Sequence, residues 1–252
     1  MGLLHGVGAA LISVRGLRKS FGRQPVLQGV DLDVPAGSIT VIIGRSGGGK
    51  SVLLRHLLGL LRPDAGQVQV AGVEVSRLSG RALDAVRARY GVVFQGGALF
   101  DSLTCFDNVA FPLREKLRLP RADVVDRVRR ALEQVGLAGV EHKYPAEISG
   151  GMRKRVAIAR ALVTEPDIIF FDEPTTGLDP ILVNTIHRLI QDLHRKYRFT
   201  AVMVSHEIPE IFTLADAVAM LHDGRIVEVG PPAAIQASAN PVVQRFIRGE
   251  PE

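Results

Sequence analysis

The 252-residue sequence has one cysteine, no tryptophan, 5% aromatic residues and no long apolar stretch. The single cysteine, Cys105, excludes an intrachain disulfide and fits a reducing compartment. The longest apolar runs, such as residues 168–171, are far shorter than the roughly 20 residues of a membrane-spanning helix. Residues 1–10 are apolar but lack the basic segment of a signal peptide. We therefore expect an intracellular protein without a membrane span of its own.

The net charge is +5, but the basic residues are scattered along the chain. A positive balance can suit nucleic acid or an anionic membrane. Aromatic residues that could stack on bases do not accompany the charges, so the pattern favours an ordinary basic surface and predicts no nucleic-acid partner. Hydrophobic residues at 46% and charged residues at 23% are typical of globular proteins, with either one large α/β domain or two smaller ones.

Residues 44–51 match the phosphate-loop pattern of Gly, four residues, Gly, Lys and Ser or Thr. An apolar β-branched run precedes this motif and a helix-like segment follows it. Glycines let successive N–H groups point into one concavity at a helix N-terminus, which suits phosphates. The alternative is a glycine-rich turn without a ligand, but such a turn does not require Lys50 and Ser51 at the two fixed positions of the motif. The motif predicts that Lys50 neutralises the β- and γ-phosphates and that Ser51 binds Mg²⁺. The predicted nucleotide contacts are Gly44, Arg45, Ser46, Gly47, Gly48, Gly49, Lys50, Ser51 and Val52.

A second candidate site follows the apolar run 168–171, which predicts a buried strand. Asp172 lies at its carboxyl end, where ligands bind in open α/β sheets, and we expect it to hold Mg²⁺. Glu173 is expected to orient and deprotonate an attacking water. A solvated turn before Pro174 is the alternative, and the phosphate loop disfavours it. His206 follows another predicted strand and should lie at the same end of the sheet as Asp172.

Ser149, Gly150 and Gly151 precede a helix rich in cationic residues. Ser149 is a plausible helix N-cap, and the two glycines expose backbone N–H groups at a helix N-terminus. This would be a second anion site in a chain whose phosphate loop is already complete. One nucleotide cannot easily lie against both sites of one chain. A two-fold, head-to-tail dimer in which each copy offers both halves is therefore expected.

The hydrophobic pattern predicts a mainly parallel sheet with helices on both faces. Alternation with period two predicts a short antiparallel β region over residues 12–15 and 27–34, with Phe21 in the turn between them. Residues 217–221 and 225–229 read as a hairpin. Residues 96–151 have almost no strand signal and predict a helical insertion, with helices at 106–113 and 121–136. Further strands are predicted at 67–72, 90–94 and 200–204, and further helices at 77–89, 152–164, 181–197, 208–214 and in the C-terminal tail.

The Ser-Gly-Gly segment before a basic helix, with the Asp-Glu strand about twenty residues later, resembles the signature segment of ATP-binding-cassette (ABC) ATPases. The resemblance covers nearly the whole chain and implies the P-loop NTPase fold of that family: a RecA-like mixed sheet core, an antiparallel β region and a helical subdomain. It implies a single domain over residues 1–252, with core regions 10–95 and 152–230, a helical subdomain at 96–151 and a tail at 231–252.

The same resemblance implies ATP and Mg²⁺ as ligands and assigns roles to four further residues. Phe21 would stack on adenine, Gln95 would report on the metal and the water, Asp179 would couple two nucleotide sites, and His206 would contact the γ-phosphate. Ile148 and Met152 depart from the commonest signature, which has Leu and Gln at these places.

Residues 93–104 and 108–115, together with 48–52 and 148–155, resemble the ATPase subunits of bacterial Mla- and Mce-type lipid transporters. That resemblance implies a dimer on the cytoplasmic face of the inner membrane, working on transmembrane permease subunits. An MCE-domain lipid-binding protein and sometimes a small STAS-domain protein would complete the assembly. The segment after Gln95 would face the permease.

Three alternative functions remain. The first is the ATPase subunit of an ABC importer for another solute. The second is a soluble ABC protein acting on nucleic acid, which would carry a long heptad insertion or two cassettes in one chain, and neither is present. The third is a regulatory module without turnover, which the presence of both Glu173 and His206 disfavours.

Overall fold

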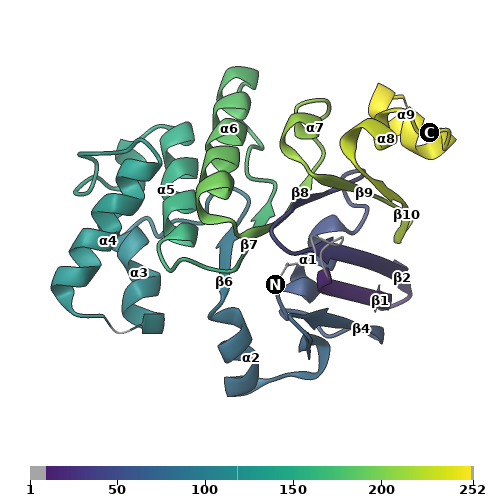
Figure 1. The fold of residues 1–252 in the computed structure, drawn as a ribbon, viewed down its shortest axis with the longest axis horizontal. Helices are drawn as coiled ribbons and strands as arrows, with labels where there is room; N and C mark the ends of the chain where they lie inside the picture. Colours follow the sequence, from purple (N-terminus) through teal and green to yellow (C-terminus); the bar gives the residue numbers. More distant parts are fainter. Residues whose placement is uncertain (1–9, 118, 251–252) are drawn as a thin grey trace, which may run out of the picture. The chain divides into compact units, whose positions relative to one another are not determined.

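The computed structural model describes residues 10–117 and 119–250, which group into two compact units (Figure 1). The first unit combines the N-terminal residues up to Arg87 with the residues from Thr200 onward. The second unit spans Ala88–Phe199, so it includes the predicted helical region 96–151. None of the helices in the described residues is both long and apolar enough to cross a membrane.

The predicted antiparallel β region is confirmed in the first unit, with longer strands than expected. Its four strands are ordered β2-β1-β4-β5 and pair antiparallel. Alternation decides which side is buried: Ile12 and Val14 of β1 are fully buried, whereas Arg15 is exposed. A register shift after Val14 then turns Leu17 to the buried side. The four strands are β1 (Ala10–Phe21), β2 (Gln24–Pro35), β4 (Ala65–Val70) and β5 (Val73–Glu74).

A mixed set of strands in the first unit carries the phosphate loop. Its order is β10-β9-β3-β8, with β3 parallel to both β8 and β9, and with β9 and β10 forming the predicted antiparallel hairpin. Every residue of β3 and β8 is buried, as expected for parallel strands with continuous apolar sequences. The strands are β3 (Ile39–Ile43), β8 (Thr200–Ser205), β9 (Ala217–His222) and β10 (Arg225–Gly230).

Two helices of the first unit are shorter than predicted. The helix expected at 208–214 is only α7 (Ile211–Leu214), because a proline at 209 disfavours helical conformation at Ile208. The helix expected at 77–89 is interrupted, since Leu78 is extended, and it forms a 3₁₀ turn at Val75–Arg77 followed by α2 (Gly80–Arg87). The helix after the phosphate loop is α1 (Lys50–Leu57).

The C-terminal tail is helical, as predicted, and forms α8 (Pro232–Gln236) and α9 (Pro241–Arg248). Helix α8 packs on the β9-β10 hairpin and contacts α9, which Figure 1 shows in yellow. The Asn240 side chain caps α9 by accepting a hydrogen bond from the N–H of Val242.

In the described residues, the second unit combines two parallel strands with four α-helices of 8 to 18 residues. In β6 and β7, Tyr90 pairs with Ile168 and Val93 pairs with Phe171. No strand lies between residues 94 and 167 of the described chain, in agreement with the predicted helical insertion. Helices α3, α4 and α5 pack against one another (Figure 1). The elements are β6 (Tyr90–Val93), α3 (Cys105–Pro112), a π-helical turn (Leu113–Leu117), α4 (Arg121–Gln134), a 3₁₀ turn (Pro145–Glu147), α5 (Gly150–Leu162), β7 (Ile168–Asp172) and α6 (Pro180–Tyr197).

Candidate functional site

The loop between β3 and α1 has a backbone that only glycine accommodates well. Gly44, Gly47 and Gly49 have φ angles of 152°, 75° and 95°. A Cβ atom on Gly44 would lie 2.3 Å from the carbonyl oxygen of Leu221, which is too close for any side chain. The loop therefore folds tightly against β9, and its glycines keep the concave side free of side chains.

Lys50 and the start of α1 give this loop its positive character. The Lys50 side chain is nearly buried, and its Nζ atom donates hydrogen bonds of 2.8 Å to the carbonyl oxygens of Gly44 and Arg45. The first turn of α1 has no acidic residue, and its N-cap, Gly49, provides no side-chain acceptor. A held ammonium group and the N–H groups of a helix N-terminus fit an anionic phosphate chain.

His206 lies beside the phosphate loop in the first unit. Strands β3 and β8 are parallel, and Ile43 pairs with Ser205, so Gly44 and His206 follow paired residues. His206 also lines the same cavity as Arg45 and Ser46. The predicted placement of this histidine at the carboxyl ends of the strands therefore agrees with the register.

Phe21 is the last residue of β1, where it pairs with Gln24, so its predicted place in the turn is wrong by one residue; the residue is 48% exposed. The Nζ atom of Lys19 lies 5.7 Å from the centre of the Phe21 ring. An exposed aromatic face of this kind is available for stacking, and its contact with adenine remains a prediction.

In the second unit, the structure brings Gln95 and Glu173 together. They follow the neighbouring parallel strands β6 and β7, and Gln95 Nε2 donates to Glu173 Oε2 over 3.3 Å. Thr176 Oγ1 donates to the same oxygen over 3.1 Å. The sequence analysis did not single out Thr176, although a hydroxyl three residues after Glu173 is close enough along the chain to reach its carboxylate. Asp172 is the last residue of β7, as predicted.

Arg160 of α5 is a second residue that sequence reasoning missed. Its guanidinium donates hydrogen bonds of 2.7 Å and 2.8 Å to the carbonyl oxygens of Gly97 and Ala98. These bonds fasten the loop that follows Gln95 to α5. Burial lowers the pKa of Arg160, but a guanidinium stays charged at neutral pH.

Ser149 and Asp179 both cap helices of the second unit. Ser149 Oγ accepts a hydrogen bond from the N–H of Met152 at the start of α5. Asp179 Oδ1 accepts hydrogen bonds from the N–H groups of Ile181 and Leu182 at the start of α6. The predicted cap at Ser149 is confirmed, and the roles of both residues at a nucleotide remain predictions.

The candidate site residues are thus divided between the units. Phe21, the phosphate loop and His206 belong to the first unit, and the other predicted site residues belong to the second. In the described residues, no three His, Cys, Asp or Glu side chains gather as a metal site by themselves. The second-unit candidates are Gln95, Ser149, Gly150, Gly151, Asp172, Glu173 and Asp179.

The sequence pattern of the family described as "ABC transporter" matches residues 27–176. The chain is 44% identical over 238 residues to the "Probable ribonucleotide transport ATP-binding protein mkl" of Mycobacterium leprae, covering 94% of this chain and 69% of that protein. The Mycobacterium tuberculosis protein of the same name is also 44% identical, and 66% of it is covered. The chain therefore spans about two thirds of the length of these mycobacterial relatives.

The chain is also 42% identical over 241 residues to the "Intermembrane phospholipid transport system ATP-binding protein MlaF" of Escherichia coli K12, covering 96% of this chain and 90% of that protein. Among solved structures, the dimeric ATP-binding cassette MJ0796 bound to ADP and Pi has 30% identity and a TM-score of 0.80, over 88% of this chain and 98% of that one. The cbiO1 protein of Clostridium perfringens, part of the ABC transporter complex cbiONQ, has 28% identity and a TM-score of 0.84 over 95% of each chain.

Proposed function

Because this chain belongs to the ABC transporter family, we propose that it is the ATP-hydrolysing subunit of a bacterial transporter that moves phospholipids or other lipids between membranes. The observation that carries the ATPase part is the glycine cradle between β3 and α1, with the Lys50 ammonium held against it. The lipid part rests on the similarity to the E. coli protein, which extends over 96% of this chain.

In the proposed site, the loop amides and Lys50 bind the β- and γ-phosphates of ATP, and Phe21 stacks on the adenine. Ser51, Gln95 and Asp172 hold Mg²⁺, which neutralises phosphate charge when it is bound. Glu173, oriented by Gln95 and Thr176, accepts a proton from the attacking water.

The dimer supplies the rest of the site. Ser149, Gly150 and Gly151 of one copy close on the γ-phosphate bound by the other copy, where His206 also contacts it. Asp179 couples the two nucleotide sites. The dimeric state of the cassette MJ0796 supports this part of the proposal. A two-fold dimer suits this proposal, because each copy then contributes its phosphate loop to one nucleotide site and its residues 149–151 to the other.

The transport partners follow from the proposed lipid function. The chain works on transmembrane permease subunits at the cytoplasmic face of the inner membrane, with an MCE-domain lipid-binding protein and a STAS-domain protein as further subunits. The segment after Gln95, fastened by Arg160, faces the permease. A second candidate function is transport of another solute, since the mycobacterial relatives carry a name that refers to ribonucleotides.

Isolation of the complex from membranes of the source cell separates these functions. A permease that copurifies with an MCE-domain protein and bound phospholipid, detected by mass spectrometry, supports lipid transport. A permease that copurifies with a solute-binding protein and no lipid supports the second function. Copurification of nucleic acid without membrane subunits would contradict both.

The hydrolytic role is tested with Glu173→Gln, because the amide keeps the shape of the side chain but is no base. We expect ATP turnover to fall at least about a hundredfold, with an ATP-bound dimer that persists. Glu133→Gln, at an exposed position of α4, makes the same chemical change outside the site and is the control. Turnover of Glu173→Gln near the wild-type value would contradict the assignment.

A further inference from the structure

The first unit contains a cavity of about 1020 Å³ between the phosphate loop and the C-terminal helix α9. Its volume is at the upper end of the range of small-molecule sites, roughly 300–1,000 Å³. Arg45 and Ser46 of the phosphate loop line it, together with residues 242 and 245–250. The remaining lining residues include His206 and His222. Residues far apart in the sequence thus line one cavity, which local sequence patterns did not predict.

Helix α9, which lines this cavity, is anchored to the rest of the first unit. Its residue Val243 is fully buried. The N–H of its N-cap, Asn240, donates a hydrogen bond to Ser238 Oγ over 3.0 Å. The hydroxyl of Ser238 donates to the Glu228 carboxylate of β10. The helix ends at Gly249, and the N–H of Glu250 donates to the carbonyl oxygen of Arg245 over 3.0 Å. These contacts fix the backbone of α9, and Arg245 and Arg248 of this helix line the cavity.

The charge of the cavity lining is mostly positive. Three arginines line the cavity, one from the phosphate loop and two from α9, and among the described residues Glu250 is the one acidic residue of the lining. Glu250 lies 3.8 Å from the guanidinium of Arg248. Apolar side chains such as Met220 and Phe246 cover other parts of the wall. A cavity with several guanidinium groups beside an anion-binding loop suits a phosphate group, which guanidinium binds with paired hydrogen bonds.

We propose that this cavity is a second phosphate subsite, in which Arg245 and Arg248 of α9 bind a phosphate group next to the phosphate loop. Two sources share this chemistry. One is the inorganic phosphate that leaves after water has attacked the γ-phosphorus of ATP and the bond to the ADP oxygen has broken. The other is the phosphate of a lipid head group, whose acyl part would lie on the apolar wall. The first source rests on the proposed ATPase function.

The test measures binding of two probes to the full chain by isothermal titration calorimetry, with ADP saturating the phosphate loop. The probes are inorganic phosphate and dihexanoyl phosphatidic acid below its micelle concentration. Since each arginine is exposed, we expect Arg245→Gln and Arg248→Gln each to weaken binding about three- to tenfold. Glu250→Gln should strengthen it, because the carboxylate competes for Arg248. If α9 had only a structural role, the arginine variants and Glu250→Gln would not change the affinity for phosphate in opposite directions.

Arg81→Gln is the matched control, because Arg81 is an exposed arginine of α2 in the same unit and does not line the cavity. The unfolding temperature of each variant is measured to show that it is folded. Loss that is confined to inorganic phosphate assigns the subsite to the product, and loss that is confined to the lipid probe assigns it to a head group.

Unchanged affinity for both probes in the Arg245→Gln/Arg248→Gln variant would overturn the proposal. Phosphate binding is also measured in Glu173→Gln, in which the proposed hydrolysis is blocked, so that binding and turnover are judged separately. If the ATPase proposal is wrong, the wild type has no ATP turnover, but phosphate binding still depends on the two arginines.

Discussion

The amide of Gln95 and the carboxylate of Glu173 meet over 3.3 Å because β6 and β7 run parallel and end side by side. Oxygen Oε2 of Glu173 also accepts a hydrogen bond from the hydroxyl of Thr176 over 3.1 Å. Two donors thus fix one oxygen of the candidate base. Glu173 itself has a φ angle of 48°, a conformation that is uncommon for a residue with a side chain. Its carboxylate is therefore placed by a constrained backbone and by two neutral donors.

This arrangement predicts that Gln95→Ala lowers ATP turnover about tenfold through a less well oriented Glu173. ATP affinity should fall less than turnover, because Lys50 and the loop amides make the proposed phosphate contacts and Gln95 is only one of three proposed Mg²⁺ ligands. Steady-state kinetics gives kcat and KM separately. Gln134→Ala in α4 is the control. A variant whose KM rises while kcat is unchanged would show that Gln95 does not orient the base.

Substitutions at two glycines of the phosphate loop distinguish the effect of a steric clash from that of backbone strain. Gly44→Ala would put Cβ 2.3 Å from the Leu221 carbonyl oxygen, whereas Gly47→Ala meets nothing within 4 Å. Both positions have positive φ, so Gly47→Ala should cost only about 1 kcal/mol in the free energy of unfolding. Gly44→Ala should cost about 3 kcal/mol or more and abolish ATP binding. Urea unfolding and nucleotide titration of both variants check this. Equal losses of stability would contradict the close approach to β9.

Elements with a local signal were predicted well from sequence. Continuous apolar runs identified β3 and β8, and alternation identified the antiparallel region. Two helices were predicted too long, because the chain leaves the helical conformation at Leu78 and at Ile208 within otherwise helical sequence patterns. Arg160 was missed for another reason: its role depends on which loop packs on α5, and that information is tertiary. The same holds for α9, whose place beside the phosphate loop no motif indicates.

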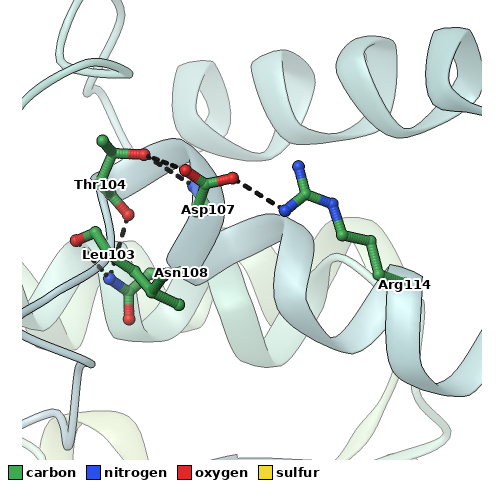
Figure 2. A network of polar contacts seen from close by, with 5 residues as sticks. All are labelled: Leu103, Thr104, Asp107, Asn108 and Arg114. Atoms are coloured by element: carbon green, nitrogen blue, oxygen red, sulfur yellow. Dashed lines mark hydrogen bonds and ion pairs between the residues drawn. The ribbon is translucent and has the colours of Figure 1, made fainter.

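Asn108 of α3 is a polar side chain that is fully buried. Figure 2 shows it beside Leu103 and Thr104, near the partly exposed pair of Asp107 and Arg114. Its Nδ2 donates to the carbonyl oxygens of Phe100, Leu103 and Thr104, and its Oδ1 accepts from the N–H of Phe100. One amide thus fastens the turn before α3 to the helix.

We expect Asn108→Ala to lower the free energy of unfolding by about 2–4 kcal/mol, because it leaves four part-buried hydrogen bonds of the backbone unmade and a cavity at a fully buried position. Arg114→Gln breaks the ion pair of 2.8 Å with Asp107, which is partly exposed, and should cost at most about 1 kcal/mol. Urea denaturation of both variants gives the comparison. A larger loss for Arg114→Gln would mean that the exposed pair, and not the buried amide, holds this turn.

His56 of α1 predicts how stability depends on pH. Burial lowers the pKa of His56 below its ordinary value of about 6.5. The hydrogen bond of 2.7 Å between Nδ1 and the Val52 carbonyl oxygen acts in the opposite direction, and the nearby Lys19 charge lowers the pKa further. Between the lowered pKa of the folded state and about pH 6.5, the unfolded state therefore binds a proton that the folded state does not. The contribution to stability is fully present above that pH and is lost as the pH falls through the lower, folded pKa.

We expect the free energy of unfolding, measured by urea denaturation between pH 7.5 and 5, to fall less steeply in His56→Gln than in the wild type. A glutamine amide can still donate to the Val52 carbonyl oxygen, so stability at pH 7.5 should change little. The difference in slope can reach at most about 1.4 kcal/mol per pH unit. His142→Gln, at an exposed position of the second unit, should leave the slope unchanged. Identical slopes in the wild type and His56→Gln would mean that His56 gains its proton in the folded chain as readily as in the unfolded one, in contradiction to its burial.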